Sequence, residues 1–180
     1  MNWYAIFVES GKEEIVQKYL SMYFDADILY SMVPRRVVPE RRKGKIYHVM
    51  KTLFPGYVLI KTRMNGNMLH KMRSIPDFYR FVNNGSCYTK EAGEYYCQIR
   101  EEEMSVLFKL IEKGDIISYS KIKIEESKVY VVSGPLHGLE GTIKKIDKRK
   151  KRAKVQLNLL GKEQTVELGI ELSVNDSVRS

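Results

Sequence analysis

Residues 53–61 read Leu-Phe-Pro-Gly-Tyr-Val-Leu-Ile-Lys, in which a proline-glycine pair leads directly into a run of strand-forming residues. Proline and glycine favour a turn because one fixes φ and the other accepts a positive φ. The residues that follow are aromatic, β-branched or aliphatic, as in a buried strand. We therefore expect a central strand of a sheet at 57–61.

The N-terminal residues predict a strand followed by a helix. Residues 3–9 form a short apolar run, and residues 12–24 place apolar side chains at the spacing of an amphipathic helix. Ser10, with Glu13 three positions later, predicts a capping box at the start of this helix.

A basic hairpin is expected between this helix and the central strand. Strand-forming residues at 28–39 and 46–49 flank the sequence Arg41-Arg42-Lys43-Gly44-Lys45. Its composition predicts an exposed hairpin tip with four positive charges.

After the central strand the pattern predicts a helix at 66–72, a strand at 78–82 and a turn at 83–85. A further helix begins at Glu101, has acidic residues in its first turn as the macrodipole favours, and ends at Gly114. No helical period continues from 115 to 123, which predicts a linker.

The C-terminal residues predict a small all-β barrel. Short strand-like runs at 129–132, 141–146, 153–160 and 164–168 are separated by turns. A helical form of this region is disfavoured because each of its glycines costs about 1 kcal/mol in a helix interior. We expect a domain at 1–113, a linker at 114–123 and a domain at 124–180.

Charge and composition narrow the functional classes. Thirty-one Lys and Arg against 22 Asp and Glu give a net charge of +9 and a pI near 9.4, which favours nucleic acid, an acidic protein surface or membrane headgroups as partner. No apolar run approaches the roughly 18 residues of a membrane span, so we expect a cytoplasmic protein.

No motif of catalysis or metal binding is present in the sequence. The two cysteines, Cys87 and Cys97, match no zinc spacing and predict reduced thiols, with a redox switch as the alternative. The three histidines are scattered, and no hydrolase, zincin or nucleotide-binding motif occurs. We expect neither an enzyme nor a bound metal or cofactor.

Three motifs in this order resemble the NusG family of bacterial transcription elongation factors. They are Trp3-Tyr4, the segment 53–59, and Val131-Val132-Ser133-Gly134-Pro135 with Gly138 and Gly141. The resemblance implies an α+β chain: an N-terminal NusG-type α/β sandwich, an antiparallel sheet with flanking helices, and a C-terminal five-stranded KOW β-barrel.

The resemblance also implies binding to the clamp helices of RNA polymerase by an aromatic and apolar surface. Phe54 and Tyr57 stand at the family's signature positions, and Tyr4 and Phe81 are further candidates from their strand positions. Each of these four is alternatively a core residue. His70, followed by Arg73, stands where relatives contact the other side of the DNA cleft or the non-template strand, with a solvated helix residue as the alternative.

Two basic segments are candidates for nucleic-acid binding. Arg41, Arg42 and Lys43 resemble the family's basic hairpin near upstream DNA. The second segment carries eight cations in eleven residues with only Asp147 opposed: Lys144, Lys145, Lys148, Arg149, Lys150, Lys151, Arg152 and Lys154. Such a run suits phosphates and predicts salt-dependent binding of emerging RNA. The alternative for both segments is a solvated basic loop.

Leu160 departs from the general NusG pattern, in which an aromatic residue before the glycine helps to bind termination factor Rho or a ribosomal protein. An aliphatic side chain cannot stack, so both contacts are in doubt. Together with the basic run, this points to a specialised paralogue, closer to the LoaP-type antiterminators than to RfaH. RfaH-like relatives can hold the C-terminal domain as a helical hairpin, whereas we expect the barrel here.

The expected function is therefore antitermination by a monomer that binds RNA polymerase and an RNA hairpin, away from any membrane. Two alternatives remain open. One is a general NusG elongation factor, and the other, from a different class, is a ribosome-associated KOW protein that binds RNA.

Overall fold

The computed structural model describes residues 1–84, 89–91 and 93–173. By their internal contacts these residues divide into two compact units. The first unit comprises 1–33, 54–105 and 158–162, and the second comprises 34–53, 106–157 and the described residues from Glu163 onward. The predicted turn at 83–85 and Cys87 fall partly or wholly outside the described residues.

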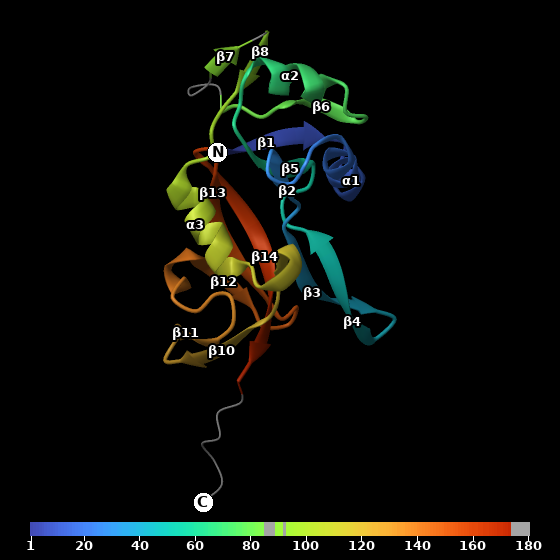
Figure 1. The fold of residues 1–180 in the computed structure, drawn as a ribbon. Coiled ribbons are helices and arrows are strands. Elements are labelled where there is room, and N and C mark those ends of the chain that lie inside the picture. The colour runs from blue at the N-terminus through green and yellow to red at the C-terminus, as the bar shows by residue number, and fades with distance from the viewer. Residues whose placement is uncertain (85–88, 92, 174–180) are drawn as a thin grey trace, which may run out of the picture. The chain divides into compact units, whose positions relative to one another are not determined.

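A four-stranded antiparallel sheet forms the first unit, in the order β2-β5-β1-β6 (Figure 1). Its strands are β1 (Asn2–Val8), β2 (Leu29–Met32), β5 (Tyr57–Thr62) and β6 (Phe78–Phe81). The central position of β5, between β1 and β2, confirms the strand predicted after the proline-glycine turn.

Helices α1 (Glu13–Tyr23) and α2 (Gly66–Arg73) cover one face of this sheet. Val16 and Leu20 of α1 join Leu69 and Met72 of α2 in a core cluster with Ile6 of β1. Side chains alternate along a strand. The residues next to the core residues in each strand therefore point to the opposite face of the sheet.

The predicted capping box of α1 is wrong. The helix is preceded by Lys12, which makes no side-chain capping bond. Glu13 is 3% exposed, and its carboxylate accepts hydrogen bonds from the backbone N–H of Gly11 (2.8 Å) and of Gly56 (2.6 Å). Glu13 thus holds the proline-glycine turn against the start of α1.

Two more elements complete the first unit. A short ribbon pairs β7 (Thr89–Glu91) with β8 (Glu94–Tyr96), and α3 (Glu101–Leu110) begins there at the predicted glutamates. The helix ends at Leu110, four residues before the predicted end at Gly114. Gly114 lies in the following turn, with a φ of 68° in the left-handed region that glycine accepts.

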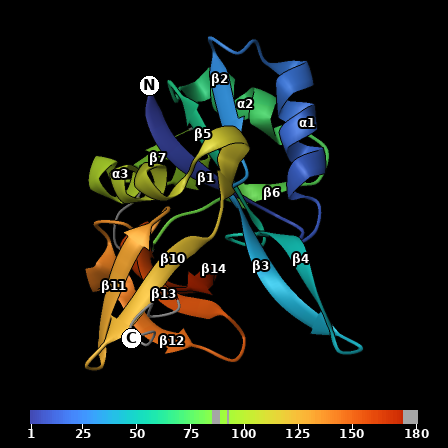
Figure 2. The same cartoon turned by 90° about the horizontal axis from the view of Figure 1, so that it is seen from below.

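The second unit contains the long hairpin of β3 (Arg35–Arg42) and β4 (Lys45–Thr52), seen from another side in Figure 2. Its turn is shorter than the predicted five-residue tip. Only Lys43 and Gly44 lie between the strands, with φ of 47° and 79°, as a tight hairpin turn with two positive φ values requires. A short strand, β9 (Ile116–Ile117), pairs with β3 in parallel.

A curved five-stranded sheet completes the second unit, in the order β11-β10-β14-β13-β12 (Figure 1). Its strands are β10 (Ser120–Glu125), β11 (Lys128–Ser133), β12 (Ile143–Asp147), β13 (Arg152–Leu159) and β14 (Lys162–Leu172). The predicted all-β C-terminal region is confirmed, and residues 152–159 form a strand and not a helix. The expected linker at 114–123 contains β9 and the first part of β10.

Candidate functional sites

The basic run lies on β12, on β13 and on the turn that joins them. Seven of its eight cations are exposed: Lys144, Lys145, Lys148, Arg149, Lys150, Lys151 and Lys154. The Asp147 carboxylate accepts a hydrogen bond from the backbone N–H of Lys150 (2.8 Å), and the backbone N–H of Ile170 in β14 donates to the carbonyl of Lys151 (3.0 Å). These bonds fix the turn that presents the cations to solvent.

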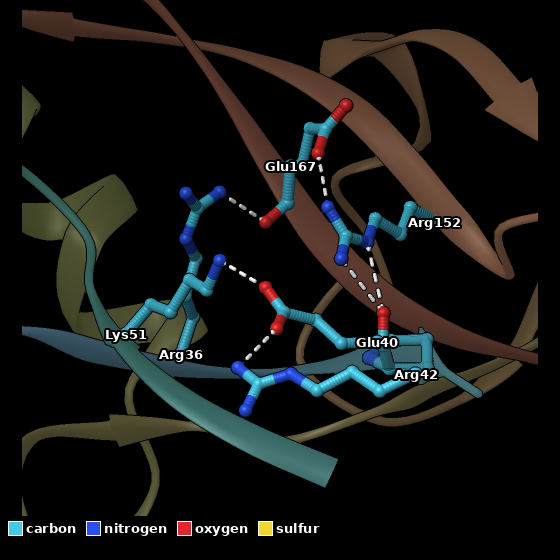
Figure 3. Close-up of polar contacts among 7 residues, drawn as sticks. Arg36, Glu40, Arg42, Lys51, Arg152 and Glu167 are labelled. Carbon is cyan, nitrogen blue, oxygen red and sulfur yellow. Dashed lines mark hydrogen bonds and ion pairs between the residues drawn. The ribbon is translucent and has the colours of Figure 1, made fainter. Parts of the chain in front are cut away.

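Arg152 is the one cation of the run with a different environment, because its side chain is only 16% exposed. Its Nε and Nη2 donate to the carbonyl oxygen of Pro39 in β3 (3.2 and 2.7 Å), and its Nη1 donates to Oε2 of Glu167 in β14 (2.7 Å) (Figure 3). The guanidinium therefore joins the hairpin to the curved sheet.

Glu167 is bound from two sides. Beside its ion pair with Arg152, its backbone carbonyl accepts a hydrogen bond from Arg36 of β3 (Figure 3). The hydrogen bond from Arg152 lowers the pKa of the Glu167 carboxyl, and burial lowers the pKa of the Arg36 guanidinium. Two arginines from different strands thus hold β3 against β14.

Within the hairpin, Glu40 interacts with two basic side chains. Its carboxylate pairs with Lys51 of β4 and accepts a hydrogen bond from Arg42 (2.8 Å) (Figure 3). These two partners lower the pKa of Glu40 to about 2. The three tip residues predicted to bind nucleic acid, Arg41, Arg42 and Lys43, are all exposed, and Arg42 is also paired with Glu40 within the hairpin.

A groove of about 690 Å³ lies between the hairpin and the β12–β13 turn. Its lining includes five cations and two carboxylates, and consists of Pro39, Glu40, Arg41, Ile46, Asp147, Arg149, Lys150, Lys151 and Arg152. A second groove, of about 550 Å³, is lined by residues of the other side of the turn, among them Lys144, Lys145 and Lys148. Most of the predicted basic residues thus line two separate grooves, while Arg42, Lys43 and Lys154 line neither.

Aromatic side chains collect on the sheet face of the first unit opposite α1 and α2. The ring of Phe7 lies 5.9 Å from that of Tyr57 and 6.1 Å from that of Tyr79, and the Arg80 guanidinium lies 5.3 Å from the Phe7 ring. Tyr79 is 55% exposed. We call Phe7, Tyr57, Tyr79 and Arg80 the aromatic face.

Gly56 of the signature segment fits closely against this face. Its φ is 84°, and a Cβ atom on it would lie 3.1 Å from Cε2 of Phe7. A larger residue would push against the Phe7 ring, so the glycine helps Phe7 and Tyr57 to pack together.

The other residues predicted for polymerase contact lie elsewhere. Tyr4 and Phe81 are 5% and 1% exposed and belong to the core cluster, while Phe54 is buried at the end of the hairpin segment. His70 is exposed on α2, which packs on the opposite face of the sheet from Tyr57. The sequence prediction missed Phe7 and Tyr79, although alternation along β1 places Trp3, Ala5 and Phe7 on the face opposite Tyr4 and Ile6.

Three further predictions concern chemistry and partner binding. Among the described residues, no group of three His, Cys, Asp or Glu side chains is placed to hold a metal ion. No helix among them is long and apolar enough to cross a membrane. Leu160, where the general family pattern has an aromatic ring, is 3% exposed and has a φ of 54°.

The N-terminal residues match the family model described as transcription termination factor nusG, over residues 1–108, and residues 127–157 match the KOW motif. The transcription termination/antitermination protein NusG of Rickettsia prowazekii is 31% identical over 176 residues, which cover 93% of this chain and 86% of that protein. The protein of the same name from Bacillus subtilis is 28% identical over 172 residues, with 93% and 94% covered.

A solved structure described as "Domain interaction in Thermotoga maritima NusG" has the same fold. Its TM-score is 0.55 at 24% identity, and the match covers 93% of each chain. The arrangement of elements is thus that of a NusG-type chain with a KOW motif.

Proposed function

The chain belongs to the NusG family of transcription factors, and we propose that within this family it is a specialised antiterminator directed by RNA. Members of the family bind RNA polymerase. The proposal adds that the second unit binds an RNA hairpin through the basic run, so that the factor acts on those transcripts that carry the hairpin.

The observation that carries the proposal is the exposure of seven cations on one turn and its adjoining strands. Cations that neutralise phosphates release condensed counterions, which drives binding and makes it depend on salt. The paired major groove of A-form RNA is too narrow for most side chains. Sequence selection therefore falls to a loop, bulge or widened groove of the hairpin.

For polymerase we propose the aromatic face, centred on Tyr57, as the contact surface. Aromatic side chains supply much of the energy of protein interfaces because they bury a large area at little cost in rotamer freedom. Phe7 and Tyr79 extend the surface around Tyr57. Tyr4 and Phe81 contribute by packing in the core beneath the sheet, and Phe54 is also buried, so we do not assign these three side chains a direct contact.

The burial of Leu160 supports a chain that does not use this position for Rho or a ribosomal protein. The basic hairpin tip, with Arg41 and Lys43 exposed, supports a contact with nucleic acid by the same counterion argument. For His70 we retain a weaker proposal, a polar contact made from the α2 side.

A general elongation factor is the second candidate, favoured by relatives of about 30% identity over more than 90% of the chain. Such a factor would follow polymerase on all genes and would need no RNA signal. A ribosome-associated protein is disfavoured because the family model matches the N-terminal 108 residues and not the KOW motif alone.

A gel-shift titration across salt concentrations tests RNA binding by the basic run. If about half of the seven exposed cations contact phosphates, log K against log salt should have a slope of roughly −3. The triple variant Lys148→Gln, Lys150→Gln and Lys151→Gln should lose most of this slope. The variant Lys61→Gln, Lys71→Gln and Lys109→Gln removes as many charges elsewhere and is the control. Equal affinity of the triple variant and the wild type would remove the case for RNA-directed antitermination.

A further inference from the structure

Side-chain hydrogen bonds connect the β3–β4 hairpin to the residues that follow the β12–β13 turn. Arg152, at the first residue of β13, donates to the backbone of Pro39 in β3 as well as to Glu167 in β14. Arg36 of β3 also donates to the backbone of Glu167. Two basic segments that are 113 residues apart in sequence therefore belong to one fixed arrangement (Figure 3).

This arrangement places cations on both walls of the groove of about 690 Å³. Arg41 comes from the hairpin, and Arg149, Lys150 and Lys151 come from the turn. The exposed side chain of Ile46 adds an apolar patch. Of the two carboxylates, Glu40 is neutralised by Lys51 and Arg42, and Asp147 accepts a backbone hydrogen bond from within the turn.

The lining points to a polyanion as the occupant. A pocket for a small ligand is mostly apolar with a few polar groups, whereas this groove is rimmed by cations with Ile46 and Pro39 as its apolar side chains. The planar guanidinium groups of Arg41 and Arg149 match the geometry of phosphate oxygens. A nucleic-acid duplex carries about one charge per 1.7 Å of its axis, a density that an acidic peptide does not reach along one wall.

We propose that the hairpin and the β12–β13 turn form a single groove for the phosphate backbone of RNA, with Arg152 as the positioning residue that holds its two walls together. The inference rests on the proposed RNA binding and extends it in two ways. It assigns the hairpin residue Arg41 to the RNA site, and it removes Arg152 from the phosphate contacts.

The first test compares the two walls. Affinity for a fluorescently labelled RNA stem-loop is measured at several KCl concentrations for the full chain with Arg41→Gln, with Lys150→Gln and with both changes. Each single change should weaken binding three- to tenfold and reduce the magnitude of the salt slope by about 1, as for the loss of one phosphate contact. The control Lys128→Gln, at the first residue of β11 and absent from the lining of both grooves, should change neither.

The outcomes separate the composite groove from the proposed function. If Lys150→Gln weakens binding and Arg41→Gln does not, the composite groove is wrong while RNA binding by the turn stands. If neither variant differs from Lys128→Gln, RNA binding by the turn fails as well. Tighter binding of the same stem-loop made of DNA, or its full displacement by a polyglutamate peptide, would contradict RNA as the occupant.

The second test addresses Arg152 through two substitutions. Arg152→Lys keeps the charge but cannot reach the Pro39 carbonyl and Glu167 together, and Arg152→Gln loses the charge. A positioning role predicts that both variants weaken RNA binding to a similar degree, and that Arg41→Gln has little further effect in either. Circular dichroism verifies the fold, and Glu167→Gln, which removes one of the two anchors, replaces any variant that does not fold.

A direct phosphate contact by Arg152 predicts a different pattern. Arg152→Lys would then bind as the wild type does, only Arg152→Gln would lose affinity, and Arg41→Gln would keep its full effect in both. That result would overturn the positioning role.

Discussion

Arg152 and Lys151 are neighbours in one basic run, yet their side chains have different roles because their surroundings differ. Lys151 is exposed, whereas the donors of Arg152 are already occupied by a backbone carbonyl and a carboxylate. A charged group whose donors are already occupied can position other residues of a site, but it is not available to contact a phosphate. The same distinction applies to aromatic residues, since Tyr4 lies in the core and Phe7 packs on the opposite face of the same strand.

Tyr57→Ala should weaken binding to RNA polymerase by about 2 kcal/mol, or roughly 30-fold, because an interface anchor of this kind contributes at least that much. The half-buried ring leaves the sheet core intact when it is removed. Binding is measured by titrating labelled protein with core polymerase after circular dichroism has verified the fold. Tyr130→Ala, which removes an exposed tyrosine of the second unit, is the control. A folded Tyr57→Ala variant with the affinity of this control would exclude Tyr57 from the interface.

The Glu40 carboxyl should titrate near pH 2 because Lys51 and Arg42 favour its charged form. A pKa lowered from the ordinary 4.5 stabilises the folded state above about pH 4.5, and this contribution is lost as the pH falls through about 2. Carbon-13 NMR of the carboxyl measures the midpoint directly. Lys51→Gln should raise the midpoint toward 4.5, whereas Lys45→Gln should leave it low. A wild-type midpoint near 4.5 would contradict the pairing.

Among the elements, the order of strands and helices could be read from the sequence because hydrophobic period and turn residues agreed locally. This holds for β1, α1, β5 and four of the five strands of the curved sheet, namely β11, β12, β13 and β14. Sequence did not reveal β10, although Ile122 and Ile124 alternate with lysines, because residues 115–123 lack a helical period and this predicts a linker. It also did not reveal the partners of Arg152, since Pro39 is 113 residues away and no local pattern joins the two segments.

The turn after β11 provides an element-scale prediction. Gly134 has a φ of 94°, and a Cβ atom there would lie 2.6 Å from the Tyr119 carbonyl oxygen and 2.8 Å from Cα of Ser120. Gly134→Ala should therefore lower the free energy of unfolding by about 3 kcal/mol, from left-handed backbone strain plus overpacking. Gly138→Ala meets no atom within 4 Å at a φ of 77° and should cost only about 1 kcal/mol of strain. Urea denaturation compares them, and equal losses would contradict the packing at Gly134.

For the whole molecule, we propose that the two units have different partners, and this proposal accounts for the net charge of +9. The first unit presents an aromatic face with a single nearby guanidinium, which suits a protein surface. The second unit presents most of the basic run and the hairpin tip, which suits phosphate. Net charge alone is compatible with nucleic acid, an acidic protein or a membrane as partner. The distribution of exposed side chains favours nucleic acid as the partner of the second unit.

Crosslinking of the protein to RNA in cells, followed by sequencing of the bound RNA, tests RNA-directed antitermination most directly. Wild-type protein should be enriched at a few transcript leaders, with readthrough of the terminators downstream of them. The Lys148→Gln, Lys150→Gln and Lys151→Gln variant should lose this enrichment while still copurifying with polymerase. Even occupancy across all transcribed genes, unchanged by the variant, would contradict the account and identify a general elongation factor.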